Sequence, residues 1–202
     1  MIKTITALVL NRFHILIWIT LAILAVATSI KTMEWLGGYY SASAFPVSVP
    51  KGQLTFNAQT TKGYYQTLLD LGTLDKYLLT QKLDFLLMVT FLVSMFLLGA
   101  AATRLINWQF KDSKLTKFSL GIMWITPIAA LFDALENMVS FVMLSNPTHF
   151  SDWLIWPYST FAAAKFSLIT LGYVWAIIAV ILTSLTFILR CLPKQIRAGR
   201  NS

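Results

Sequence analysis

The chain has 202 residues, of which 57% are hydrophobic and only 12% are charged. Soluble domains carry about 25% charged residues, so this much apolar surface cannot be hidden in one soluble core, and part of it is expected to face lipid. The net charge of +8 does not indicate a nucleic-acid partner, because the basic residues flank apolar segments and form no continuous aromatic and basic stripe.

Four apolar segments reach the length of about 20 residues that a helix needs to cross a bilayer. The first of them also resembles a signal peptide, with Ala25-Val26-Ala27 as a candidate cleavage site. The apolar run continues beyond that site, which favours an uncleaved span. The sequence therefore predicts an all-α fold, a four-helix transmembrane bundle that forms a single integral membrane domain, with spans at residues 13–30, 85–102, 120–144 and 161–189.

The long connection between the first two spans, residues 32–84, is too apolar for a simple linker. Residues 45–50 are expected to be extended, because a proline disfavours helix in the residue before it. Residues 64–71 and 73–79 are expected to form two short helices broken at Gly72, with Thr73 as an N-cap. We expect this connection to form a partly helical cap over one end of the bundle.

Lysine and arginine are concentrated in three of the segments that flank the spans, whereas the short connection between spans three and four has neither. The positive-inside rule then places the N- and C-termini in the cytoplasm and the cap outside it. The composition favours the inner (plasma) membrane of a bacterium. The basic residues that carry this argument are Lys3, Arg12, Arg104, Lys111, Lys114, Lys117, Arg190, Lys194, Arg197 and Arg200.

The third span carries an acidic sequence, Asp133-Ala134-Leu135-Glu136-Asn137. Spacings of three and four residues place Asp133, Glu136 and Asn137 on one helical face, which Ser140 extends by a further turn. An ionised carboxylate in the bilayer costs about 2.5–3.5 kcal/mol on the insertion scale. This face is therefore expected to turn toward the interior of the bundle.

Lys165, early in span four, is expected to lie near the acidic face and to pair with Glu136 or Asp133. Together with Asp84 at the start of span two, three acids against one lysine leave an excess of negative charge, so at least one carboxyl is expected to carry a proton near neutral pH. Two interpretations stay open: a network that fixes helix association, or a functional polar pocket. In the second, Asp133 and Glu136 are the candidate catalytic acid/base groups, and the candidate binding residues are Asp84, Asn137, Lys165, Ser140 and Tyr77.

No metal site is expected, because His14 and His149 fall on opposite sides of the membrane and no ligand spacing is present. The single cysteine, Cys191, excludes an internal disulfide and CxxC thiol chemistry. No GxSxG, P-loop, HExxH or GxGxxG pattern occurs, and no cofactor is expected. If the protein is an enzyme, its carboxyl groups suit proton transfer or isomerisation better than nucleophilic catalysis.

The residues of this site resemble the pattern of a group of small bacterial four-span membrane proteins with a DxxEN motif in the third span. The matching positions extend over residues 64–173 and are Gly72, Tyr77, Asp84, Asp133, Glu136, Asn137 and Lys165. The Gly-Arg pair that this group often carries before the tyrosine is missing here. A weaker architectural likeness to the emopamil-binding-protein superfamily implies acids that face an intramembrane ligand pocket.

Three functional hypotheses follow. The protein binds or acts on a lipid-like small molecule in a polar pocket in the cap-side half, surrounded by membrane lipids. Alternatively, it transports protons or a small cation along the acidic face as a homo-oligomer, or it is a non-catalytic membrane assembly or accessory subunit. A cavity that opens toward lipid would favour the first, a polar path to Arg104 or His14 the second, and a dry, fully paired cluster the third.

Overall fold

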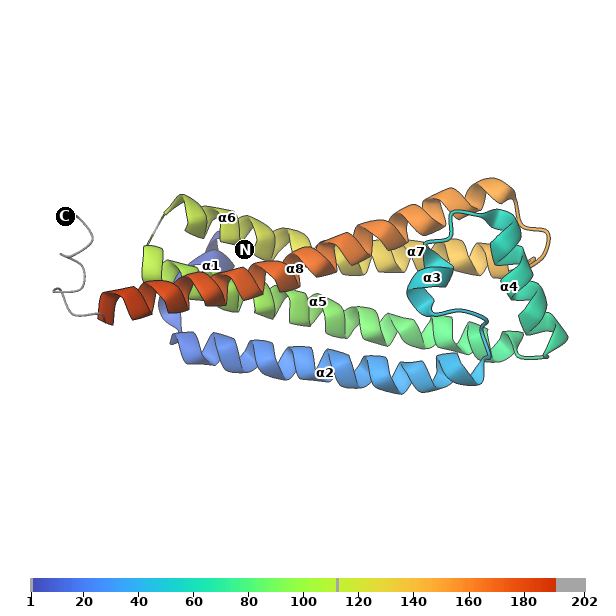
Figure 1. The fold of residues 1–202 in the computed structure, drawn as a ribbon, viewed down its shortest axis with the longest axis horizontal. Helices are drawn as coiled ribbons and strands as arrows, with labels where there is room; N and C mark the ends of the chain where they lie inside the picture. Colours follow the sequence, from blue (N-terminus) through green and yellow to red (C-terminus); the bar gives the residue numbers. More distant parts are fainter. Residues whose placement is uncertain (1, 112, 192–202) are drawn as a thin grey trace, which may run out of the picture.

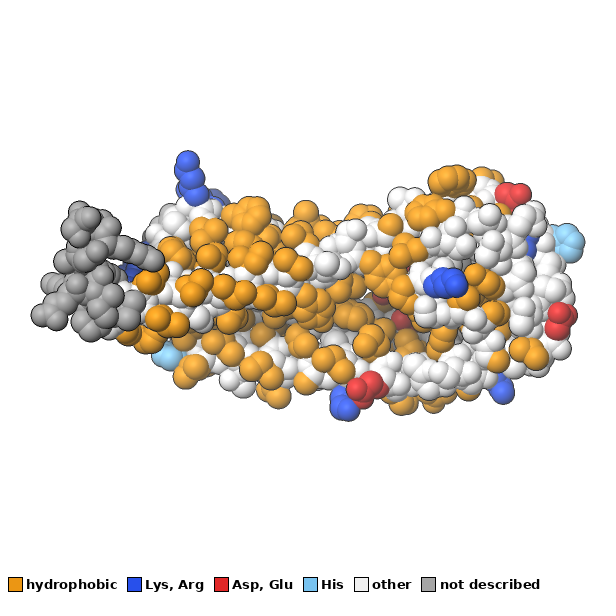
Figure 2. Space-filling model, in the orientation of Figure 1, with side chains coloured by type: hydrophobic (Ala, Val, Ile, Leu, Met, Phe, Trp, Pro, Cys, Tyr) orange, Lys and Arg blue, Asp and Glu red, His pale blue; other side chains and the backbone are white. Residues whose placement is uncertain are grey.

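The computed structural model describes residues 2–111 and 113–191, and these residues form helices and loops with no strand. The architecture is the predicted all-α bundle of a multi-pass membrane protein, with four helical segments long and apolar enough to span a bilayer (Figure 1). Figure 2 shows hydrophobic side chains over most of the length of these segments. They are α2 (Ile15–Ala42), α5 (Leu74–Phe110), α6 (Lys114–Ile125) continued by the 3-10 turn η2 (Thr126–Ile128) and α7 (Ala129–Leu144), and α8 (Ile155–Cys191).

Two of these helices extend well beyond the segments predicted from hydropathy. α2 continues to Ala42, and α5 begins at Leu74. At a rise of about 1.5 Å per residue α5 is about 55 Å long, which exceeds the hydrocarbon thickness of about 30 Å. Hydropathy marks the lipid-facing part of a helix only, so the connection outside the two helices shortens from residues 32–84 to residues 43–73.

This connection forms the cap, which covers one end of the bundle (Figure 1). It contains α3 (Val49–Gln53) and α4 (Ala58–Asp70). The predicted extended segment is irregular up to Ser48, but Pro50 lies in the first turn of α3, where a proline costs no hydrogen bond. After α4, Gly72 adopts a φ of +62°, which a glycine reaches without strain. The second short helix is the start of α5, and Thr73 precedes it without a side-chain capping bond.

An aromatic cluster attaches the cap to the bundle. Tyr65 of α4 is fully buried, and its ring centroid lies 6.1 Å from that of Tyr77 on α5. Phe45 stacks on Tyr77 with centroids 4.8 Å apart. An ion pair of 2.5 Å between Lys62 and Asp152 joins α4 to the segment before α8. The cap is therefore held against both α5 and α8.

In the half of the bundle opposite the cap, α5, α6 and α8 pack closely against one another. A Cβ atom on Gly99 would lie 2.7 Å from the Cα atom of Met123, so α5 and α6 approach as closely as only a glycine permits. Ser119 of α6 contacts the Thr103 hydroxyl at 2.9 Å and accepts a hydrogen bond of 2.8 Å from Trp175 Nε1. These bonds tie α5, α6 and α8 together.

The described ends of the chain lie on the same side of the bundle, opposite the cap (Figure 1). Before α2, a short helix α1 (Ile2–Ala7) and a π-helical turn η1 (Leu8–Arg12) precede the first span. The guanidinium of Arg104 donates to the carbonyl oxygen of Leu10 in this turn. Three basic residues used in the orientation prediction, Lys194, Arg197 and Arg200, lie outside the described residues.

Candidate functional site

The acidic face of the third span lies inside the bundle. Asp133 is 6% exposed, and Glu136, Asn137 and Ser140 have no exposed surface. Met138, on the other side of the same helix, is 60% exposed. The helical spacing thus places the polar groups of α7 away from lipid, as their cost in the bilayer predicts.

Lys165 of α8 reaches across to both acids of α7. Its Nζ lies 2.6 Å from Asp133 Oδ1 and 2.5 Å from Glu136 Oε2. The sequence allowed a pair with either acid, and the structure contains both pairs. We call these three residues the ion-pair triad. One ammonium ion faces two carboxyl groups in it, so the triad has no positive charge to spare.

Asp84 approaches the triad from α5. Its Oδ2 accepts a hydrogen bond of 2.9 Å from Asn137 Nδ2, which also donates to the backbone oxygen of Gln81 at 3.4 Å. Among the described residues, Asp84 has no ion-pair partner. Asn137 therefore positions this carboxyl group but leaves its charge unbalanced.

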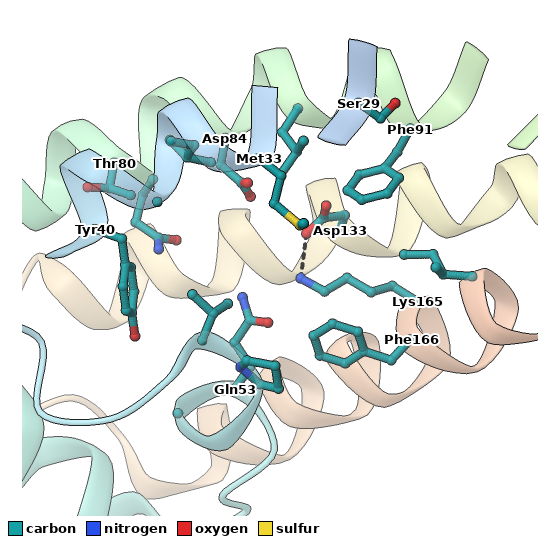
Figure 3. A pocket seen from close by; sticks show the side chains of 18 of the residues that line it. Ser29, Met33, Tyr40, Gln53, Thr80, Asp84, Phe91, Asp133, Lys165 and Phe166 are labelled. Carbon is teal, nitrogen blue, oxygen red and sulfur yellow. Dashed lines mark hydrogen bonds and ion pairs between the residues drawn. The ribbon is translucent and has the colours of Figure 1, made fainter. Parts of the chain in front are cut away.

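A cavity of about 420 Å³ lies beside the triad, with α2, α3, α5, α7 and α8 around it. Asp84, Asp133 and Lys165 lie on its wall, and Figure 3 shows Lys165 crossing from α8 toward Asp133. Gln53 of α3 points into the cavity from the cap (Figure 3), and its buried Oε1 has no hydrogen-bond partner among the described residues. The rest of the wall is mostly aliphatic and aromatic, including Met33, Leu36, Tyr40, Leu87, Phe91 and Phe166. Small-molecule sites typically have this make-up and a volume of about 300–1,000 Å³.

The predicted site residues divide into two groups. Tyr77 lies on the cavity wall with the three charged residues named above. Glu136, Asn137 and Ser140 are not part of the wall; they lie behind it, fully buried. Glu136 can therefore act on the cavity only through Lys165, which it contacts.

Gln53 is a site residue that the sequence analysis missed. It belongs to a five-residue helix in the cap, where no periodic pattern links it to the spans. Only the folding of the cap over the bundle brings its amide opposite Lys165. Pro46, Pro50 and Gly52 predict an irregular segment here. Nothing in the sequence predicts which part of the bundle this segment packs against.

The cavity opens sideways, between two spans. α2 packs along α5 but makes hardly any contact with α8. Figure 2 shows the resulting hollow beside α3, with acidic side chains visible at its bottom. A molecule in the membrane could thus reach the charged residues without passing through the cap.

A second hollow of about 690 Å³ continues along the same gap, away from the cap, between α2, α5 and α8. We call it the apolar groove, because every residue on its wall except Tyr173 is Ala, Ile, Leu or Val. Ile30 and Tyr173 line both hollows. The cavity and the apolar groove therefore adjoin each other at these two residues.

The described residues contain no group of three or more His, Cys, Asp or Glu side chains placed to hold a metal ion. No protein family model, no curated protein and no solved structure matches this chain. The resemblances drawn from the DxxEN pattern and from the four-span architecture thus stay predictions, and the function of the site is inferred from its own geometry.

Proposed function

We propose that this membrane protein binds a lipid-like amphiphile in the cavity between α2 and α8. The observation that supports this most directly is a cavity that joins charged groups to a lateral opening. A wall that is mostly apolar, with a few polar groups gathered at one place, suits a ligand with an apolar body and a polar head. Ionisable groups within a bilayer are costly and commonly functional.

Asp133 and Lys165 are two of the charged groups that such a ligand would meet on the cavity wall. If the ligand is transformed, Asp133 is placed to exchange a proton with it, because its carboxyl group lies on the wall and contacts Lys165. General acid–base catalysis requires such a group within hydrogen-bond reach of the reacting atom. Glu136 would hold Lys165 in position from behind the wall.

The alternatives have less support. Transport of protons or cations requires polar groups along the whole path, but the apolar groove has no charged residue on its wall and neither Arg104 nor His14 borders it. A role limited to helix association accounts for the ion pairs, yet it does not account for a cavity next to them. Binding of an amphiphile accounts for both.

The binding proposal is tested with lipid extracts and native mass spectra of the purified protein. Met33 lies on the cavity wall (Figure 3), so Met33→Trp should fill the cavity and remove a specifically enriched amphiphile. Leu24→Trp is the matched control, because Leu24 is exposed on the same helix and borders neither hollow. Equal lipid content in wild type and both variants would contradict the proposal. The same spectra report whether the protein is a homo-oligomer.

We also propose that the cap faces outward from the inner membrane, with both termini in the cytoplasm. Arg104, Lys111, Lys114 and Lys117 all lie toward the end opposite the cap, which supports this orientation. Cys191 is free and exposed at that end, so a membrane-impermeant maleimide should label it only after the cells are permeabilised. Asp70→Cys, placed in the cap of a Cys191→Ser background, should be labelled in intact cells. The reverse labelling pattern would show that the cap faces the cytoplasm and would contradict the proposed orientation.

A further inference from the structure

We propose that the ligand carries a protonated amine in its head and that its aliphatic chain lies in the apolar groove. This inference rests on the proposed function and adds the chemical class of the ligand. Two independent features support it: the depth at which the two hollows lie in the membrane, and the unbalanced acceptors on the cavity wall.

Exposed charges mark where the helices leave the hydrocarbon on the cap side. Lys31 and Glu34 form an exposed ion pair of 2.7 Å on α2, and Lys82 is exposed on α5. From Lys82 to Arg104, α5 rises about 33 Å, which is close to the hydrocarbon thickness of about 30 Å. Asp84, on the cavity wall, lies two residues after Lys82 on this helix. The cavity therefore lies at the boundary between head groups and acyl chains.

The apolar groove runs from this boundary toward the middle of the membrane. Along α2 it extends from Ile30 to Ile19, a rise of about 17 Å, or about half of the hydrocarbon thickness. A molecule with its head in the cavity and its chain in the groove has the depth and orientation of a lipid in the cap-side leaflet. It can enter between α2 and α8 without turning over.

Small side chains create the groove. Ala22 and Ala27 on α2, Ala101 and Ala102 on α5, and Ala176 on α8 all lie on its wall. Their methyl groups do not fill the space between the helices, and Tyr173 is the one polar side chain that borders it among the residues that the structure describes. An aliphatic chain is the occupant that needs no hydrogen bond there and makes dispersion contacts with the apolar wall.

The cavity presents acceptors and no spare positive charge. Lys165 is the one lysine or arginine on its described wall, and it already contacts two carboxyl groups. Asp84 has only the uncharged donor Asn137, and Gln53 Oε1 is buried and unpaired. At low dielectric an anionic head would be repelled here. An ammonium group would balance Asp84 and donate to Gln53 through charge-assisted hydrogen bonds.

Long-chain amines and aminophospholipids both present this chemistry. The test uses full-length protein in nanodiscs of phosphatidylglycerol, which has no amine, and photoreactive probes with a diazirine in the middle of the chain. Hexadecylamine, hexadecanol and palmitic acid probes carry the same chain with different heads. Mass spectrometry of cross-linked peptides should place the amine probe on groove segments of α2 and α8, with labelling about tenfold above that of the acid, which corresponds to about 1.4 kcal/mol.

Variants of the protein distinguish the contribution of the ligand's head group to binding from that of its aliphatic chain. Asp84→Asn should lower labelling by the amine about tenfold, the same 1.4 kcal/mol, and leave labelling by the alcohol unchanged. Persistent alcohol labelling also shows that this variant is folded. Asp75→Asn, at an exposed position on the same helix, should change neither. Ala176→Phe should abolish groove labelling by every probe, whereas Val174→Phe, exposed on α8 and outside the groove, should not.

The outcomes distinguish the two proposals. If no probe labels the groove segments of the wild-type protein, the binding function itself is wrong. If amine and alcohol label equally, or if Asp84→Asn has no effect on the amine, the amine head is wrong and binding stands. If the amine is preferred, a phosphatidylethanolamine probe assigns its source. Stronger labelling than by hexadecylamine identifies an aminophospholipid, and weaker labelling identifies a single-chain amine.

Discussion

Two buried polar clusters of this protein differ in how completely their groups are paired. In the half opposite the cap, Ser119 bonds both Thr103 and Trp175, so each of these three side chains has a partner. On the cap side, Gln53 Oε1 and Glu136 Oε1 are buried with no hydrogen-bond partner among the described residues. An unpaired buried group costs about 1–3 kcal/mol. The first cluster is explained by helix association alone, whereas the second leaves acceptors for something further to satisfy.

The largest expected effect comes from removing the charge that holds the cap-side cluster together. Lys165→Met leaves Asp133 and Glu136 without their counter-charge, and breaking a buried ion pair from one side costs about 3–5 kcal/mol. Thermal unfolding in detergent should show this loss, and Lys31→Met, at an exposed ion pair on α2, should show almost none.

Glu136→Gln sharpens the interpretation of that result. Because Asp133 still contacts Lys165 in this variant, its loss of stability should be clearly smaller than that of Lys165→Met. If the two variants lose folded protein to the same extent, the cluster serves helix association and not a ligand. The triple variant Asp133→Asn, Glu136→Gln, Lys165→Met should recover part of the stability, since it removes the three charges of the ion-pair triad together.

The length of the apolar segments predicted the four spans, and helical spacing predicted the inward face of α7, because both follow from the cost of polar groups in lipid. The sequence left a polar pocket open as one of two interpretations and did not predict the shape of the cavity. That depends on α2 packing on α5 without closing against α8, and on alanines that contribute no obvious signal. Gln53 was missed for the same reason: its position follows from the fold of the cap. Lys165 was predicted to pair with one acid, since spacing cannot show that the side chain reaches two.

A smaller effect is expected in the fully paired cluster. Trp175→Phe removes the donor to Ser119 but leaves the contact of Ser119 with Thr103, so the loss should be about 1 kcal/mol. Chemical unfolding in mixed micelles measures it, with Trp156→Phe as the control at an exposed position. If Trp175→Phe loses more stability than Lys165→Met, the fully paired cluster contributes more to stability than the cap-side cluster, contrary to this prediction.

The smallest effect at neutral pH is expected at Tyr65, where the cap closes over the cap-side cluster. Burial raises the pKa of the Tyr65 hydroxyl well above its ordinary value of 10.0, the Glu136 carboxylate adds to the rise, and the neighbouring Ser140 hydroxyl acts against it. The unfolded chain releases this proton near pH 10 while the folded protein keeps it. The stability that Tyr65 contributes is therefore present below pH 10 and lost as the pH rises above it.

At pH 7, Tyr65→Phe should accordingly change stability by less than about 1 kcal/mol. Above pH 10, the stability of this variant should decline less steeply than that of the wild type. Unfolding measured across the alkaline range checks this, with Tyr39→Phe as the control at an exposed position of α2. A decline as steep as that of the wild type would mean that water reaches Tyr65 through the cap. In that case the cap would not shield the buried polar groups behind the cavity wall from water.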